Sequence, residues 1–156
     1  MFTSAWSNTE SSILWLWSGD SNVDNDHARW VEEIGQAIAQ FGDRPLSIIM
    51  VVDPKNPPPS AFWRSRIAEA VKNGSPSTTF VLVTSSALVR GALTAIAWLW
   101  QPRFTVCHEA SYEEAVELIV KTRGGDKAVF DALLAEAQKR TSARKAIVSD
   151  FNERRA

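Results

Sequence analysis

Two uninterrupted apolar runs, Ser47–Val52 and Thr78–Thr84, dominate the middle of the chain. Runs of this length without polar alternation are typical of strands covered on both faces, as in a parallel sheet flanked by helices. Phe104–Cys107 predicts a further short strand. We therefore expect the two longer segments to be buried strands and Phe104–Cys107 to be the last, short strand.

The chain begins with a predicted antiparallel hairpin. Phe2–Ser7 and Ile13–Ser18 are rich in strand-favouring residues, and the polar segment Asn8–Ser12 connects them as a turn.

Helical periodicity follows the hairpin and the first apolar run. The first predicted helix has an apolar stripe with a spacing of three or four residues and ends at Gly42; its stripe consists of Trp30, Ile34, Ala37, Ile38 and Phe41. A second helix begins at Ser60, and Asn73 and Gly74 end it.

Three more helices complete the pattern. Ala87–Trp100 is apolar on nearly every side and ends before Pro102. Ser111 and Glu114 form a capping box that begins the fourth helix. The fifth helix runs from Asp126 to Arg140. The polar remainder, 141–156, is either an extension of this helix or a mobile tail.

This order of elements predicts an α/β fold. Strands that alternate with helices build a mixed, mostly parallel sheet with helices packed against it. We expect four to five strands and four to five helices, with residues 1–140 forming a single domain.

Composition narrows the classes of function. The chain has 156 residues, of which 45% are hydrophobic, and its 17 basic residues nearly balance its 18 acidic ones. This balance gives no bulk electrostatic reason to bind nucleic acid. The single cysteine, Cys107, excludes an internal disulfide and a multi-cysteine zinc site. We expect a cytoplasmic protein without a cofactor, a signal peptide or a stable membrane segment, since Ala87–Trp100 is shorter than the about 20 apolar residues of a bilayer span.

Three stretches carry a resemblance to a known family: IIMVVDPKNPPPSAFW, TTFVLVTSSALVRGALTAI and RFTVCHEASYEEAVELI. Their order resembles the STAS domain, the fold of bacterial anti-sigma-factor antagonists, and more closely the looser STAS-like group of bacterial proteins. The likeness covers Ile13 to Val120. It implies a regulatory module in which a partner kinase phosphorylates a serine between the third strand and its helix. Asp53 matches the family's first aspartate, but PKNPPPS replaces the usual D-S-S-G-like turn.

The loop from Asp53 to Ser60 is the first candidate site. Ser60 lies at a helix start, where the dipole and free amides favour an anion, and it is a candidate phospho-acceptor or recognition residue. The alternative role of Ser60 is an N-cap. Asp53 follows a buried strand, where open α/β sheets place ligands, or it caps the loop before Pro54.

Ser85, Ser86 and Arg90 form a second candidate, an anion contact at the next strand end. Helix capping explains the hydroxyl groups equally well. Cys107 and His108 are adjacent in a strand and point to opposite faces, which disfavours a nucleophilic dyad. We predict no catalytic residues, no metal site and a protein that is not an enzyme.

The third predicted helix is a candidate interface because it is apolar all round. Either the fifth helix covers its outer face, or a second subunit or a partner protein does. Leu88, Trp98, Leu99 and Trp100 would supply the contact. The chain also has seven tryptophans against one tyrosine, which predicts core packing with some tryptophans at a contact surface.

Two functions follow from these observations. The first is a non-enzymatic, STAS-like regulatory module that binds a protein partner or itself. The second is a carrier of a small apolar ligand or lipid, because the many tryptophan, leucine and isoleucine side chains could line a cavity.

Overall fold

The computed structural model describes residues 1–19, 23–100 and 103–153; at residues 23, 98–100 and 147–153 it describes the backbone alone. The hairpin consists of β1 (Phe2–Ser7) and β2 (Ser12–Trp17). The parallel strands are β3 (Leu46–Val52), β4 (Thr78–Val83) and β5 (Thr105–Glu109). The helices are α1 (Val23–Phe41), α2 (Ala61–Val71), α3 (Ala87–Trp100), α4 (Tyr112–Arg123) and α5 (Lys127–Glu153).

The strands form one mixed sheet in the order β1-β2-β3-β4-β5. β1 pairs antiparallel with β2, and the remaining pairs are parallel. The register places Trp15 beside Met50 and Met50 beside Leu82. This arrangement confirms the predicted fold class.

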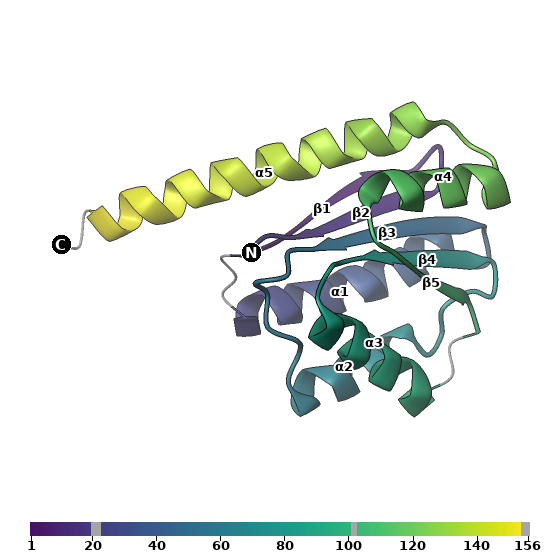
Figure 1. Cartoon of the computed structure of the whole chain (residues 1–156), viewed down its shortest axis with the longest axis horizontal. Helices are drawn as coiled ribbons and strands as arrows, with labels where there is room; N and C mark the ends of the chain where they lie inside the picture. The colour runs from purple at the N-terminus through teal and green to yellow at the C-terminus, as the bar shows by residue number, and fades with distance from the viewer. Residues whose placement is uncertain (20–22, 101–102, 154–156) are drawn as a thin grey trace.

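Helices cover both faces of the sheet (Figure 1). α1, α2 and α3 lie on one face, whereas α4 and α5 lie on the other and contact the strands directly. β5 lies at Thr105–Glu109 rather than at the predicted Phe104–Cys107. α5 continues past Arg140 to Glu153, which is the helix extension that the sequence left open as an alternative to a tail. α5 does not cover α3, because the sheet separates them.

The two faces of the sheet carry side chains of different size. The face toward α1–α3 presents large ones, including Phe2, Trp15, Trp17, Met50 and Phe80. The opposite face presents smaller ones, including Ala5, Leu14, Ile49, Val81 and Val83. Small side chains let α4 and α5 approach the sheet closely, with Ala115 and Ala137 fully buried at the contact. The large side chains hold α1–α3 further from the sheet.

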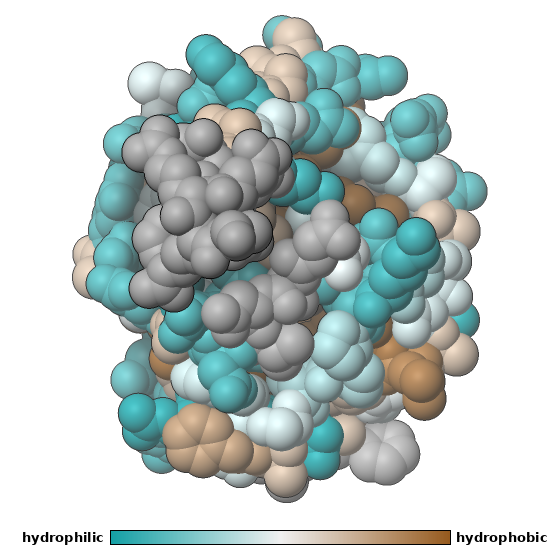
Figure 2. All heavy atoms as spheres, turned by 90° about the vertical axis from the view of Figure 1, so that its left-hand side faces the viewer, coloured by the Kyte–Doolittle hydropathy of each residue, from teal (hydrophilic) through white to brown (hydrophobic). Residues whose placement is uncertain are grey.

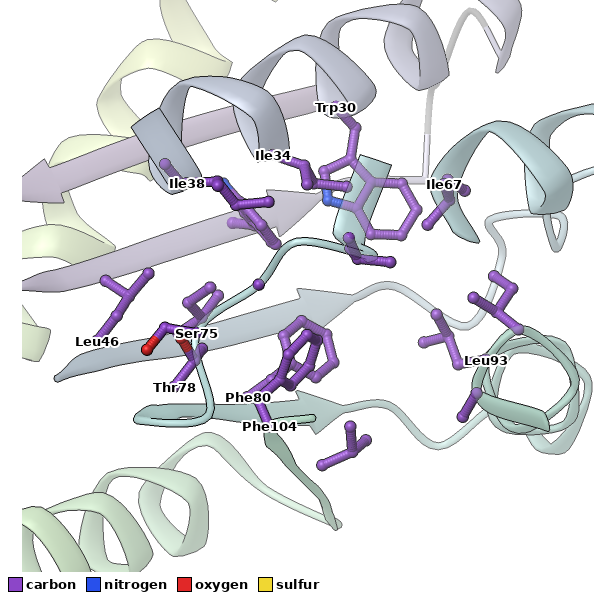
Figure 3. A pocket seen from close by; sticks show the side chains of 18 of the residues that line it. Trp30, Ile34, Ile38, Leu46, Ile67, Ser75, Thr78, Phe80, Leu93 and Phe104 are labelled. Atoms are coloured by element: carbon purple, nitrogen blue, oxygen red, sulfur yellow. The ribbon is translucent and has the colours of Figure 1, made fainter. Parts of the chain in front are cut away.

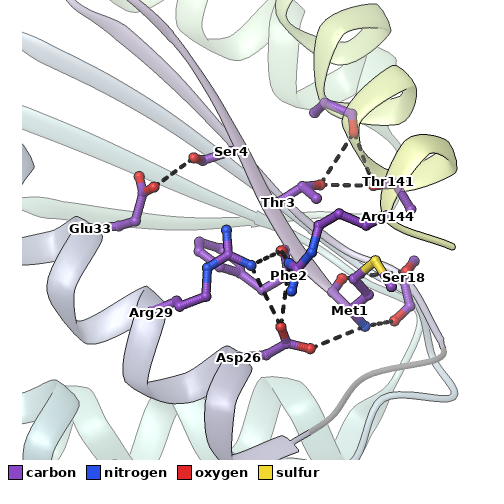
Figure 4. A network of polar contacts seen from close by, with 11 residues as sticks. Met1, Phe2, Thr3, Ser4, Ser18, Asp26, Arg29, Glu33, Thr141 and Arg144 are labelled. Atoms are coloured by element: carbon purple, nitrogen blue, oxygen red, sulfur yellow. Dashed lines mark hydrogen bonds and ion pairs between the residues drawn. The ribbon is translucent and has the colours of Figure 1, made fainter. Parts of the chain in front are cut away.

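A buried carboxylate ties α1 to β1 and α5 (Figure 4). Asp26 is 2% exposed, and its oxygens lie 3.6 Å from the amino group of Met1, 3.9 Å from Arg29 and 3.7 Å from Arg144. Both arginines also donate to the carbonyl oxygen of Phe2, at 3.1 and 2.8 Å. Charge-assisted bonds of this kind are stronger than neutral ones. Asp26 therefore acts as a structural anchor at the start of β1.

The outer edge of β1 is covered by side chains of the same two helices. Arg140 on α5 donates to the carbonyl oxygen of Ser4 at 2.7 Å. Glu33 on α1 accepts from the Ser4 hydroxyl and from Trp6 Nε1, both at 2.8 Å. Because these contacts occupy polar groups of the edge strand, they limit its pairing with another chain.

Candidate functional site

An apolar cavity lies between the sheet and α1–α3 (Figure 3). Its volume is about 80 Å³. We call it the inter-layer cavity. Its floor is formed by sheet residues, its roof by the helices, and its wall by the segments before β4 and β5. The residues labelled in Figure 3 are Trp30, Ile34, Ile38, Leu46, Ile67, Ser75, Thr78, Phe80, Leu93 and Phe104.

Bulky aromatic side chains from both layers border the cavity. Trp15 on β2 and Phe80 on β4 stand on either side of β3, with ring centroids 6.3 Å apart. Trp30 points from α1 toward the sheet and meets Trp15 edge to face. These three rings lie between the sheet and the helices α1–α3, at the border of the inter-layer cavity.

Two residues of the cavity lining, Trp15 and Trp30, each bury a polar atom. The indole Nε1 atoms of Trp15 and Trp30 are buried and find no hydrogen-bond partner among the described residues. Both residues are nearly inaccessible, at 3% and 4% exposure, and both line the inter-layer cavity. A buried donor without a partner costs about 1–3 kcal/mol. Such atoms are uncommon in native proteins and are frequently found where a ligand or water binds.

The other tryptophan N–H groups with assigned bonds show the contrast. Trp6 Nε1 donates to Glu33 at 2.8 Å, and Trp63 Nε1 donates to Asp24 at 2.9 Å. These two side chains lie outside the cavity lining. The donors of Trp15 and Trp30 are therefore distinguished by their position between the layers, where the described neighbours are almost all hydrocarbon.

One wall of the cavity is half-exposed. Ile38, Val71, Leu93 and Phe104 are each partly accessible to solvent. Phe104 packs against Gly74, where a Cβ atom would lie 3.0 Å from the phenyl ring. Glycine at this position lets the ring lie against the end of α2. These partly exposed residues form the part of the cavity wall that lies nearest the solvent.

Two other hollows are weaker candidates. One has a volume of about 310 Å³ and lies near the connection between α4 and α5, but most of its lining is exposed, including Glu10, Arg123 and Asp126. It is larger than the inter-layer cavity, but its lining is more polar and mostly exposed. The other, about 20 Å³, lies beside Asn56 and the proline loop. It has room for about one water molecule.

The predicted loop from Asp53 to Ser60 has structural contacts of its own. Asp53 Oδ1 accepts from the backbone N–H of Lys55 at 2.8 Å. Ser60 is the N-cap of α2, and its hydroxyl accepts from the N–H of Trp63. Asn56, which the sequence did not single out, donates to the carbonyl oxygen of Trp17 at 3.0 Å and is 4% exposed. These contacts hold the loop against the end of β2.

The second predicted group, Ser85, Ser86 and Arg90, also makes local contacts. Ser86 Oγ accepts from the N–H of Val89 at 3.3 Å and caps α3. Arg90 donates to the carbonyl oxygen of Thr84 at 3.0 Å, while Ser85 is exposed. The structure places these three residues close together, and the Arg90 guanidinium already donates to a backbone carbonyl group.

Cys107 and His108 lie on opposite faces of β5, as expected. Burial, with the charge of Glu109, raises the pKa of the Cys107 thiol. Burial, with the charge of Arg90, lowers the pKa of His108. Burial, with Asp131 and Glu113, raises the pKa of Tyr112. Each shift favours the neutral form. Across the described residues no three His, Cys, Asp or Glu side chains are placed to hold a metal ion.

The predicted interface on α3 is described only at its start. Leu88 is 73% exposed, and Phe62 on α2 is 62% exposed. The side chains of Trp98, Leu99 and Trp100 lie outside the described residues. Figure 2 shows the side at which β3 and β4 end; its visible atoms are mostly hydrophilic, with hydrophobic ones in separate patches. No helix in the described part of the chain is long and apolar enough to cross a membrane.

The inter-layer cavity lies away from the loop that the sequence favoured. It extends toward Leu46 and Thr78, where β3 and β4 begin, whereas Asp53 and Ser60 follow the end of β3. The sequence did contain a sign of residues that face the space between the sheet and the helices, since Trp15 and Trp17 alternate along β2 and Trp30 lies on the inner stripe of α1.

Comparisons with protein-family models, curated proteins and solved structures find no match.

Proposed function

We propose that this chain binds a small, mainly apolar molecule in the inter-layer cavity. The observation that carries the proposal is the inter-layer cavity itself, a space of about 80 Å³ with an almost entirely apolar lining that includes Trp15 and Trp30. Ligand sites in proteins have this character: mostly apolar walls with a few polar groups that orient the ligand.

The energetics favour occupation of the cavity. An unfilled cavity costs about 24 cal/mol per Å³, so 80 Å³ corresponds to about 2 kcal/mol. A ligand that fills the space recovers lost dispersion contacts and removes its own apolar surface from water. Binding therefore stabilises the folded chain by filling space that its own side chains leave empty.

Xenon tests whether the cavity accepts an apolar guest, because xenon enters dry apolar cavities. We expect saturable shifts of the methyl resonances of Ile34, Ile67 and Leu93 under xenon pressure. Ala37→Leu, which projects extra carbon atoms from α1 into the cavity, should abolish these shifts. Ala135→Leu on the exposed side of α5 serves as the matched control and should leave them unchanged.

Native mass spectrometry of protein isolated from cells tests the function itself. A co-purified small molecule that is retained by Ala135→Leu and lost from Ala37→Leu supports the proposal. A clean unliganded mass together with no xenon response at the lining methyl groups would remove the cavity as a binding site.

Protein binding is the second candidate, and the exposed Leu88 and Phe62 favour it. In this alternative the chain is a STAS-like regulatory module that contacts a second copy of itself through the starts of α2 and α3. Sedimentation velocity over a range of concentrations tests it. Association that Leu88→Ser weakens supports this alternative, and a strict monomer at every concentration removes it.

A further inference from the structure

The two edges of the sheet differ in how they are covered. β1 and β5 are the outer strands, and each pairs with one neighbouring strand. β1 is buried along its first four residues, and side chains of α1 and α5 bond to its polar groups. No residue of β5 is buried, and among the described residues no side chain bonds to its backbone. In this part of the chain, the outer edge of β5 therefore leaves a row of backbone N–H and C=O groups for another strand.

Apolar surface lies next to this edge. In Figure 1, α3 lies on the lower side of the sheet, beside β5. Leu93 and Ala97 of α3 line the inter-layer cavity together with Phe104 and Val106, and all four side chains are half-buried. A pair of five-residue strands alone buries less than the about 1,200 Å² of a specific interface. The half-buried apolar residues beside β5 supply further area to a partner that pairs with the strand.

The sequence of β5 is complementary to itself in an antiparallel arrangement. When a two-fold axis passes through Cys107, Thr105 lies opposite Glu109 of the second copy, and Val106 lies opposite His108. Residues directly opposite each other then point to the same face, so the two sheets continue into one. No residue of the strand meets a like charge, which would destabilise the pair.

Charge adds to this match. Arg103 is exposed and lies two residues before Thr105, which places it diagonal to Glu109 of the second copy. Diagonal neighbours are about 7–8 Å apart, a distance that a long side chain spans. The two-fold axis repeats this pair at the other end of the strands. The formal net charge of the whole chain is −1, so two copies do not repel each other strongly.

We infer that β5 pairs antiparallel with β5 of a second copy of this chain, with the two-fold axis at Cys107. Such a contact uses the same surface on both copies, as two-fold interfaces do. It lies at a different surface from the starts of α2 and α3, where Phe62 and Leu88 are exposed. It also adjoins the half-exposed wall of the inter-layer cavity and does not depend on a ligand there.

Disulfide cross-linking tests the pairing directly, because Cys107 is the single cysteine of the chain. Opposite residues of antiparallel strands have Cα atoms about 4.5–5.5 Å apart, within the range that a disulfide spans. Oxidation of the full chain with copper phenanthroline should therefore convert most of it to a covalent dimer. The control is Cys107→Ser combined with Gln138→Cys, on the exposed side of α5. It should cross-link at least about tenfold more slowly, because its thiols meet only by collision.

Charge reversal at the ends of the strand pair gives an independent readout. Glu109→Arg and Arg103→Glu each bring like charges together. Each should raise the dimer dissociation constant by about fivefold to tenfold, the effect of two exposed charge pairs. The double variant restores opposite charges and should restore the affinity. Glu32→Arg, exposed on α1 near the β1 edge, makes the same change in net charge and should leave the constant unaltered.

Sedimentation velocity over a range of concentrations measures these constants, and its outcomes separate the possible surfaces. A dimer that Cys107 cross-links and that the double charge reversal restores supports the β5 pairing. A dimer that Leu88→Ser weakens and Glu109→Arg does not would place the contact at the starts of α2 and α3, and the inference would be wrong. A strict monomer, with Cys107 cross-linking no faster than the Gln138→Cys control, would also overturn it. Neither result bears on ligand binding in the cavity.

Discussion

Trp15 on β2 and Trp30 on α1 meet edge to face across the two layers, with ring centroids 6.1 Å apart and planes inclined by 80°. Edge-to-face contacts of this kind are favourable for aromatic rings. Each ring nevertheless buries an N–H without an acceptor among the described residues. The contact thus combines a stable packing arrangement with two unused donors, and both residues line the cavity that we propose as the ligand site.

Replacing one buried alanine by leucine on each face of the sheet distinguishes the loosely packed face from the tightly packed one. Ala37 on α1 and Ala137 on α5 are both buried and lie on opposite faces of the sheet. Ala37→Leu fills the cavity and should raise the free energy of unfolding by about 1 kcal/mol. Ala137→Leu overpacks the close contact and should lower it by about 1–3 kcal/mol. Urea denaturation measures both, and equal losses would contradict the difference in packing.

Asp26→Asn should lower the free energy of unfolding by about 3 kcal/mol. The substitution leaves the amino group of Met1 and the guanidinium of Arg144 without their buried counter-charge. Glu69→Gln is the control, because the Glu69–Lys72 pair is exposed and contributes less than about 1 kcal/mol. Thermal and urea unfolding measure the two effects. Losses of equal size would show that Asp26 is not the anchor.

Ser60→Ala should lower the free energy of unfolding by about 1 kcal/mol, because it removes the cap of α2. Ser60→Asp should retain stability, since aspartate is also a good N-cap and its charge suits the helix dipole. Ser65→Ala, in the interior of the same helix, is the control and should be neutral or slightly stabilising. If Ser60→Asp is as destabilising as Ser60→Ala, the capping role is wrong.

Alkylation of Cys107 should be slower at pH 8 than alkylation of an unfolded peptide. Burial and the nearby charge of Glu109 raise the thiol pKa above its ordinary value of 9.0, so less reactive thiolate is present. The same shift makes the folded state lose stability as the pH rises above the unfolded value. Glu109→Gln should lower the pKa and speed alkylation, whereas Glu113→Gln should not. The pH profile of the iodoacetamide reaction measures this.

Local features of the chain were predictable because they depend on neighbouring residues. Gly42 adopts the left-handed conformation, with φ 54°, just after α1. Ser111 and Glu114 form both contacts of the capping box at α4. Both signals operate within a few residues of chain, so the sequence pattern contains them in full.

Contacts between distant segments were not predictable in this way. The sequence left open whether the fifth helix covers the third, and the sheet separates them instead. Arg144 on α5 contacts Asp26 on α1 and Phe2 on β1, and no sequence pattern relates these three elements to one another. Such contacts depend on which face each helix takes, and apolar stripes alone do not specify that face.

The sequence by itself determined the order of strands and helices, their caps and the parallel character of the sheet. The residues that carry the site, Trp15 and Trp30, were visible in it only as members of an apolar strand and an apolar stripe. Tertiary structure decided that their rings meet between the layers, that their N–H groups lack acceptors among the described residues, and that a cavity remains beside them. The physical reason is that a cavity is the space left over by many side chains at once, whereas a cap or a turn is made by a few adjacent ones.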